Sequence, residues 1–141
     1  MRGFLELTVS DAMTHPVTTV DPELTVGELE ALFERYDYNS FPVVRDERLV
    51  GIVTKFDFLR NFIFTPQSMV PHYAELMQRR VGDIMRRKPT SVASDAPLPR
   101  VLQLMVDMTI KSFPVVADAR VVGIISREDV IRALRRAVGR G

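Results

Sequence analysis

The hydrophobic and polar positions of the chain follow two periods. Apolar side chains recur every three or four residues between 26 and 36, which predicts a helix of about three turns. Two apolar runs within 41–54 flank the charged triplet 46–48 and predict a tight hairpin. A further strand is expected at 17–20 and a second helix from Thr54 onward. The expected apolar side of that second helix consists of Phe58, Leu59, Phe62 and Ile63. The predicted order is β-α-β-β-α.

This order of elements occurs twice. Residues 9–63 align with residues 81–135 at a constant offset of 72 without a gap, and 18 of the 55 aligned pairs are identical. The longest shared block, Ser-Phe-Pro-Val-Val, stands at 40–44 and again at 112–116. Because a repeat sets the architecture before any local assignment, we expect repeats at 9–63 and 81–138 joined by a connector at 64–80.

A single repeat of this size has a sheet and too little helix to bury both of its faces. Two repeats packed sheet to sheet about a pseudo-twofold axis would solve this problem, so we expect an α+β fold of α/β type. In the connector, Thr65-Pro66 resembles an N-cap followed by a first-turn proline and predicts a helix. Two roles stay open for this helix: a connector packed on the core, and a dimer contact or lid.

The composition of the 141 residues excludes several kinds of chemistry. With no cysteine, thiolate nucleophiles, cysteine-ligated zinc and iron–sulfur clusters are ruled out. The two histidines, His15 and His72, are too far apart in sequence to form a ligand pair, and we expect no metal site. No run of 18 apolar residues and no leader segment is visible, so we expect a cytoplasmic protein that does not enter a membrane.

The net charge of +1 hides an uneven distribution. Residues 1–78 contain 6 Lys/Arg and 12 Asp/Glu, whereas residues 79–141 contain 13 Lys/Arg and 6 Asp/Glu. This difference indicates either an anionic partner for the second half or charge complementarity within an assembly.

The candidate chemistry lies where the last strand of each repeat meets the following helix. Thr54 and Ser126 are each followed three residues later by an aspartate, Asp57 and Asp129. One interpretation is purely local, because the hydroxyl caps the helix and the carboxylate complements its dipole. The other is a nucleotide site, in which the turn holds a phosphate and the aspartate accepts both hydrogen bonds of a ribose diol.

The duplicated β-α-β-β-α unit, the Phe-Pro-Val-Val strand and the Gly-Ile-x-Thr/Ser-x-x-Asp turn resemble a tandem of cystathionine-β-synthase (CBS) domains, called a Bateman module. The resemblance covers about 9–63 and 81–138. It implies a stand-alone regulatory module that binds adenosine-containing ligands in two clefts between the repeats. The implied ligands are AMP, ADP and ATP, and also S-adenosylmethionine or NAD. The resemblance implies no catalytic cofactor.

The resemblance also implies composite clefts, with the late turn of one repeat facing two early segments of the other. Cleft one would consist of Ile124, Ser126, Arg127, Asp129, His15, Pro16, Val17, Tyr38, Asn39 and Ser40. Cleft two would consist of Ile52, Thr54, Asp57, Arg87, Lys88, Pro89, Ile110, Lys111 and Ser112, with Lys55 beside them. In these clefts the aspartate would hold the ribose, the Thr or Ser a phosphate, and Tyr38 would stack on the base.

Cations are concentrated in cleft two, where we expect the more phosphorylated ligand. The run 86–88 has a second interpretation, as cations that complement the carboxyl end of a short helix at 83–85. Arg60 and Arg132, one turn beyond the aspartates, fit a phosphate contact and a local ion pair equally well. Asp11 and Asp83 are expected at the starts of short helices.

The implied function is a ligand sensor that signals to a separate effector protein, since few residues remain for an output domain. The alternative is a ligand-free dimerisation scaffold, because paired modules of this kind often form homodimeric discs of four CBS domains, parallel or antiparallel. An enzyme is not expected, since the nucleophile-elbow, phosphate-loop, zinc-protease and dinucleotide-binding motifs are all missing. Nucleic-acid binding has only scattered arginines in its favour.

Overall fold

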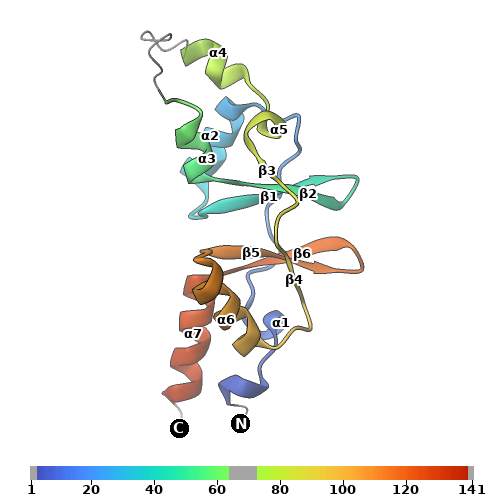
Figure 1. Cartoon of the computed structure of the whole chain (residues 1–141), viewed down its shortest axis with the longest axis vertical. Helices are drawn as coiled ribbons and strands as arrows, with labels where there is room; N and C mark the ends of the chain where they lie inside the picture. The colour runs from blue at the N-terminus through green and yellow to red at the C-terminus, as the bar shows by residue number, and fades with distance from the viewer. Residues whose placement is uncertain (1–2, 64–72, 140–141) are drawn as a thin grey trace. The chain divides into compact units, whose positions relative to one another are not determined.

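The computed structural model describes residues 3–63 and 73–139. The chain forms two compact units, each with its own hydrophobic core. The middle unit is Thr18–Pro89, and the terminal unit combines Met1–Val17 with Thr90–Gly141. Both units mix helices with a small sheet (Figure 1), so the α+β class and the two repeats are confirmed. Within the described residues, no helix has the length and apolarity needed to cross a membrane.

The described residues of the middle unit form four helices and three strands, and the strands pair antiparallel. Its elements are α2 Val26–Arg35, β1 Ser40–Arg45, β2 Arg48–Thr54, α3 Lys55–Arg60, α4 Tyr73–Gln78, α5 Val81–Ile84 and β3 Arg86–Arg87. β2 pairs with β1 and also with β3. The fully buried Phe41 and Val53 are paired across β1 and β2, and they pack with Leu29 of α2 in one core.

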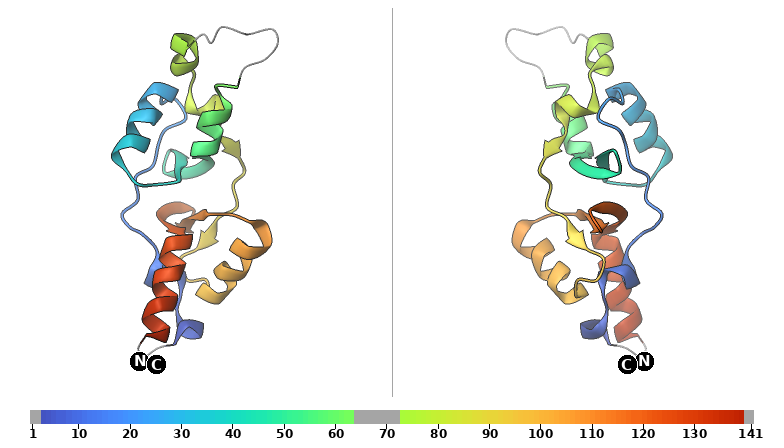
Figure 2. Two further views of the ribbon diagram at one scale, coloured as in Figure 1. Left: turned by 90° about the vertical axis from the view of Figure 1, so that its left-hand side faces the viewer. Right: turned by 90° about the vertical axis from the view of Figure 1, so that its right-hand side faces the viewer.

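The terminal unit repeats this plan. Its elements are η1 Phe4–Glu6, α1 Val9–Ala12, β4 Val92–Ala93, α6 Leu98–Met108, β5 Ser112–Ala117, β6 Arg120–Ser126 and α7 Arg127–Val138. β5 pairs antiparallel with β6 and parallel with β4. Its core holds Leu98, Phe113 and Ile125, all fully buried. Figure 2 shows η1 and α1, from the start of the chain, beside α7 from its end.

The local predictions need small corrections. The hairpin turn is the pair Asp46-Glu47, both at positive φ, and Arg48 already belongs to β2. A two-residue turn of this hand matches the twist of the strands that it joins. The strand expected at 17–20 is reduced to a single parallel bridge between Val20 and Val43. The predicted start of the connector helix lies in 64–72, outside the described residues.

The predicted apolar side of the helix after Thr54 is wrong in part. Phe58 and Phe62 pack against the core, but Leu59 and Ile63 are 66% and 65% exposed. Phe58 and Leu59 are consecutive in α3 and point about 100° apart, so Leu59 turns away from the core when Phe58 packs into it. α3 ends at Arg60, so Phe62 and Ile63 lie beyond the helix. The same division occurs in α7, where Val130 is buried and Ile131 is 54% exposed.

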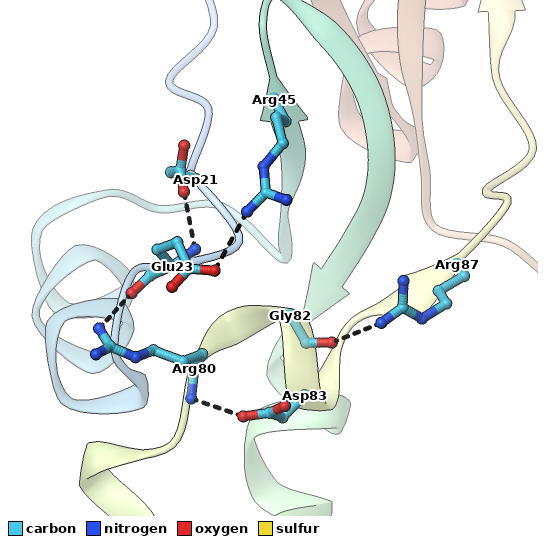
Figure 3. A network of polar contacts seen from close by, with 7 residues as sticks. All are labelled: Asp21, Glu23, Arg45, Arg80, Gly82, Asp83 and Arg87. Carbon is cyan, nitrogen blue, oxygen red and sulfur yellow. Dashed lines mark hydrogen bonds and ion pairs between the residues drawn. The ribbon is translucent and has the colours of Figure 1, made fainter.

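The end of the connector and the segment that follows it belong to the middle unit, because both are bonded to the loop that precedes α2. The Val26 N–H donates to the Arg79 carbonyl, and the Arg80 guanidinium donates to the Glu23 carbonyl, both at 2.8 Å. Glu23 in turn pairs with Arg45, as Figure 3 shows. The start of the second sequence repeat is bonded to the same loop, because the Val81 N–H donates to the Leu24 carbonyl at 2.7 Å and the Gly82 N–H to the Pro22 carbonyl at 2.8 Å.

Because residues 79–89 belong to the middle unit, the charges are distributed differently in the fold than along the sequence. Counted by compact unit, the middle unit holds 10 Lys/Arg and 11 Asp/Glu, and the terminal unit holds 9 and 7. The steep contrast between residues 1–78 and 79–141 therefore disappears, because the basic run at 79–88 lies with the acidic residues of the middle unit.

Candidate functional site

In the middle unit, Asp57 is a buried carboxylate fixed at the start of α3. Its side chain is fully buried, and its Oδ2 accepts a hydrogen bond of 3.0 Å from the Thr54 N–H. The Asp57 N–H donates to Thr54 Oγ1, also at 3.0 Å. This reciprocal capping box orients the carboxylate and leaves Oδ1 for other partners.

Oδ1 of Asp57 accepts from two guanidinium groups. Arg86 Nε lies 3.1 Å away, and an Arg60 terminal nitrogen lies 3.4 Å away. Both guanidiniums also lie near the ring of Phe56, at 6.0 and 5.8 Å from its centroid. Arg60 therefore forms the local ion pair that was one of its two interpretations.

Gly51 explains how Arg86 comes so close to Asp57. β3 runs beside β2, with Arg86 opposite Ile52 and Arg87 opposite Gly51. A Cβ on Gly51 would lie 2.6 Å from Met85 Sδ and 2.8 Å from the Arg86 carbonyl oxygen. A residue without a side chain is therefore required for this approach.

The terminal unit contains the corresponding site around Asp129, which is 3% exposed. Its Oδ2 accepts from the Ser126 N–H at 2.9 Å, and the Asp129 N–H donates to Ser126 Oγ at 3.3 Å. Arg132 pairs with Oδ1 at 3.2 Å. The residue equivalent to Arg86 is Thr14, whose hydroxyl donates to the two carboxylate oxygens at 3.2 and 3.3 Å.

The crossing at Thr14 repeats the one at Arg86. Thr14 forms a two-way backbone bridge with Ile124, and a Cβ on Gly123 would lie 2.9 Å from the Thr14 carbonyl oxygen. Thr14 belongs to the first sequence repeat and Asp129 to the second. In each unit, a segment of one repeat thus runs beside the last strand of the other repeat.

The predicted site residues divide between the two units. The middle unit holds Tyr38, Asn39, Ser40, Ile52, Thr54, Lys55, Asp57, Arg87, Lys88 and Pro89, and the terminal unit holds His15, Pro16, Val17, Ile110, Lys111, Ser112, Ile124, Ser126, Arg127 and Asp129. In each unit the segment before Phe-Pro also borders the turn. The Asn39 carbonyl accepts from the Lys55 N–H and the Lys111 carbonyl from the Arg127 N–H, at 3.1 and 2.9 Å. The assembly of two composite clefts stays a prediction.

Sequence reasoning missed Arg86 and Thr14 as partners of the aspartates. It chose Arg87, whose guanidinium lies 3.5 Å from the Gly82 carbonyl, as Figure 3 shows. Side chains alternate along a strand, so Arg86 and Arg87 point to opposite faces of β3. The 72-residue offset could have identified both residues, since it makes Thr14 and Arg86 equivalent.

Other expectations about single residues have different outcomes. Asp11 and Asp83 do lie at the starts of short helices, where they accept from the Thr8 and Arg80 N–H groups at 2.8 and 3.1 Å. The Tyr38 ring is stacked on Tyr36, with the ring centroids 5.4 Å apart. Stacking of Tyr38 on a base stays a prediction.

Each of the two repeats holds an aspartate in a capping box at the start of a helix. The model of the CBS domain matches residues 9–63 and 81–136. The chain belongs to the CBS domain family.

Solved structures of CBS pairs resemble the chain over nearly its whole length. The structure of CBSX2, a CBS-pair protein from Arabidopsis thaliana, in complex with AMP is 28% identical, with a TM-score of 0.78. The match covers 92% of this chain and 96% of that one. The CBS pair of protein MJ0100 in complex with 5′-methylthioadenosine and S-adenosyl-L-methionine is 26% identical, with a TM-score of 0.76 and coverage of 96% and 98%.

Among curated proteins, the mitochondrial CBS domain-containing protein CBSX3 of Arabidopsis thaliana is 29% identical over 144 residues. That match covers 94% of this chain and 66% of CBSX3. The chain spans between 13% and 66% of the length of the curated relatives considered, which include a tRNA nucleotidyltransferase and inosine-5′-monophosphate dehydrogenases.

Proposed function

We propose that the chain is a non-catalytic regulatory module that binds adenosine-containing nucleotides at two sites, one around Asp57 and one around Asp129. The observation that carries this proposal is the pair of equivalent, almost fully buried carboxylates, each with an outer oxygen in contact with a second segment of its unit. The complexes of CBSX2 with AMP and of MJ0100 with S-adenosylmethionine and methylthioadenosine support the ligand class.

The chemistry of the carboxylates fits this ligand class. A ribose diol offers two neighbouring hydroxyl donors, and an ionised carboxylate is an acceptor with two oxygens. Because Thr54 and Ser126 hold the inner oxygens through their backbone N–H groups, each aspartate enters binding with its orientation already set. Less orientational freedom is then lost when a ligand binds.

Signalling to a separate effector protein is the second part of the proposal. A ligand that competes for Asp57 or Asp129 would change how the crossing segments at Arg86 and Thr14 are held, and a bound protein can sense such a change. The cytoplasm remains the predicted location.

The homodimer is proposed from exposed apolar side chains. Leu59 and Ile131 occupy equivalent positions in the two repeats and are 66% and 54% exposed. Beside Ile131, an open apolar groove of about 300 Å³ separates α6 from α7. The groove is lined by Leu102, Met105, Val106, Thr109, Arg127, Val130, Ile131 and Leu134. A second copy of the chain suits this surface, because a symmetric dimer brings like patches together. A scaffold without ligand remains the alternative function.

The proposal is tested by titration calorimetry and thermal unfolding with AMP, ADP, ATP, S-adenosylmethionine and NAD. We expect at least one of these ligands to release or absorb heat and to raise the unfolding temperature, since a ligand that binds only the folded state stabilises it. No heat and no shift with every ligand, together with a dimer in light scattering, would establish the scaffold instead.

A further inference from the structure

The two aspartate sites differ in charge although their backbones correspond. The turn that carries Asp57 and the segment that crosses it contain five cations, which together with Asp57 give these two segments a formal charge of +4. They are Lys55, Arg60, Arg86, Arg87 and Lys88. The equivalent positions around Asp129 hold Arg127, Arg132, Thr14, His15 and Pro16, and Glu128 replaces Phe56. With neutral histidine, the formal charge of that site is zero.

Both carboxylate oxygens of Asp57 already accept hydrogen bonds from the protein. Oδ2 is held by the Thr54 N–H, and Oδ1 accepts from both Arg86 and Arg60. A ribose diol that approaches this carboxylate must therefore displace a guanidinium from Oδ1. Arg86 is the group that can leave, because it comes from a separate strand and its side chain is 53% exposed.

We propose that Arg86 makes a phosphate group a requirement for ligands of the Asp57 site, and that the Asp129 site accepts nucleosides with or without phosphate. This inference rests on the proposed function. A nucleoside without phosphate breaks the Arg86–Asp57 pair and gives the guanidinium no new partner. A nucleotide breaks the same pair but supplies phosphate oxygens, for which a guanidinium is a geometrically matched donor.

Thr14 imposes no such requirement on the Asp129 site. Its hydroxyl is neutral, shares its hydrogen between both oxygens at 3.2 and 3.3 Å, and reorients by rotation about one bond. When a ribose replaces it, no charge is left unpaired. The site thus matches uncharged nucleosides and cationic adenosine derivatives as well as nucleotides.

We therefore still expect the more phosphorylated ligand beside Asp57, but we now attribute this preference to Arg86 and not to Arg87. Arg86, not Arg87, touches the carboxylate that the ligand must capture. Arg87 is exposed and bonded to the Gly82 carbonyl, which makes it a matched control for charge and position.

The test is a site-resolved titration by NMR of the full chain with ¹³C-labelled methionine methyl groups. Met85 and Met13 lie at equivalent positions, against Gly51 and Gly123, and report on the two sites separately. AMP and adenosine are titrated into the wild type and into Arg86→Thr, Arg87→Thr and Thr14→Arg. For the Met85 signal, we expect Arg86→Thr to lower the ratio of AMP affinity to adenosine affinity by about tenfold to a hundredfold.

Arg87→Thr is expected to change that ratio less than about twofold, since its guanidinium is not bonded to the carboxylate. Thr14→Arg, an exchange in the other direction, is expected to raise the ratio for the Met13 signal by about tenfold. Equal ratios in the wild type, Arg86→Thr and Thr14→Arg, with AMP bound in all three, overturn the inference and leave the proposed function intact. If the wild type binds neither AMP nor adenosine at the Met85 signal, this inference is overturned, and the five-ligand calorimetry decides the proposed function separately.

Discussion

The Asp57 site and the Asp129 site share a backbone and differ in the one residue that reaches the carboxylate from the crossing segment. Both have a capping box, a glycine under the crossing and an arginine three residues beyond the aspartate. The difference lies in the residue that contacts the carboxylate from the crossing segment, which is Arg86 at Asp57 and Thr14 at Asp129. Duplication has thus kept the features that shape the chain, while the side chain at the crossing varies.

The largest expected effect comes from removing one carboxylate charge at a time. Asp57→Asn should weaken binding at the Met85 signal by about a hundredfold and leave the Met13 signal within about twofold, because hydrogen bonds to a charged acceptor are lost at one site only. Asp129→Asn should do the reverse. The NMR titration with AMP measures both, and a loss at both signals in either variant would mean that the sites are not independent.

The glycine under each crossing gives the next largest effect. Gly51→Ala places a Cβ 2.6 Å from Met85 Sδ and 2.8 Å from the Arg86 carbonyl oxygen, so we expect the free energy of unfolding to fall by about 1–3 kcal/mol. Gly123→Ala, with contacts of 2.7 and 2.9 Å, should behave alike. Urea unfolding measures both changes.

Gly27→Ala is the control for that experiment. Gly27 lies inside α2, and an added Cβ would meet nothing nearer than 3.4 Å, so the variant should gain up to about 1 kcal/mol from helix propensity. If Gly51→Ala is as stable as Gly27→Ala, the crossing is not the tight contact described above.

The proposed dimer surface gives a smaller, concentration-dependent effect. Ile131→Glu should raise the dimer dissociation constant at least about tenfold, since a charge replaces an apolar side chain that is counted twice in a symmetric interface. Gln103→Lys is the control, because Gln103 is exposed on α6 and does not line the groove. Sedimentation velocity measures the dissociation constant of each variant. An unchanged constant in Ile131→Glu would show that Ile131 is not in the dimer interface.

The smallest effect concerns the caps of the equivalent helices α2 and α6. Hydrogen bonds from the Thr25 N–H and hydroxyl hold the pKa of Glu28 below its ordinary value, with help from Arg80. α6 has Pro97 and Arg100 at these positions and lacks a side-chain cap. Because the folded pKa is lowered, this cap stabilises above the ordinary glutamate pKa and is lost as the pH falls through the lowered value.

Thermal unfolding of the wild type and Glu28→Gln at pH 7 and about pH 3 tests this cap. The wild type should unfold at the higher temperature at pH 7, and the difference should shrink at the acidic pH. A difference that is the same at both pH values would show that ionisation of Glu28 does not matter to α2.

Much of this comparison was predictable from the sequence. The 72-residue offset, the periodicity of 26–36 and the Thr54/Asp57 spacing were enough to predict the repeats, the order helix, hairpin, helix within each, and the two aspartates at helix starts. The assignment of 79–89 to the middle unit was not, because it depends on backbone bonds such as Val26 N–H to Arg79 C=O, which leave no pattern in residue type. From the sequence alone, the basic run 79–88 was therefore counted with the second half of the chain, residues 79–141.

The same limit applies to side chains whose direction is set by a partner. The choice between Arg86 and Arg87 depends on which face of a two-residue strand meets β2, and two residues show no periodicity. Leu59 and Ile63 were placed inside because apolar residues usually mark a core, whereas here they are exposed beside Phe58 and Phe62. The contact of Arg86 with Asp57 is the basis for the proposed ligand preference, and the exposure of Leu59 is part of the basis for the proposed dimer surface.

The most direct test of the non-equivalent sites is the binding stoichiometry of the unmodified protein by titration calorimetry with AMP and with adenosine. Two AMP molecules per chain and one adenosine molecule per chain are expected over the same concentration range. Equal stoichiometry and equal affinity for both ligands would contradict the account, because Arg86 would then impose no requirement for phosphate.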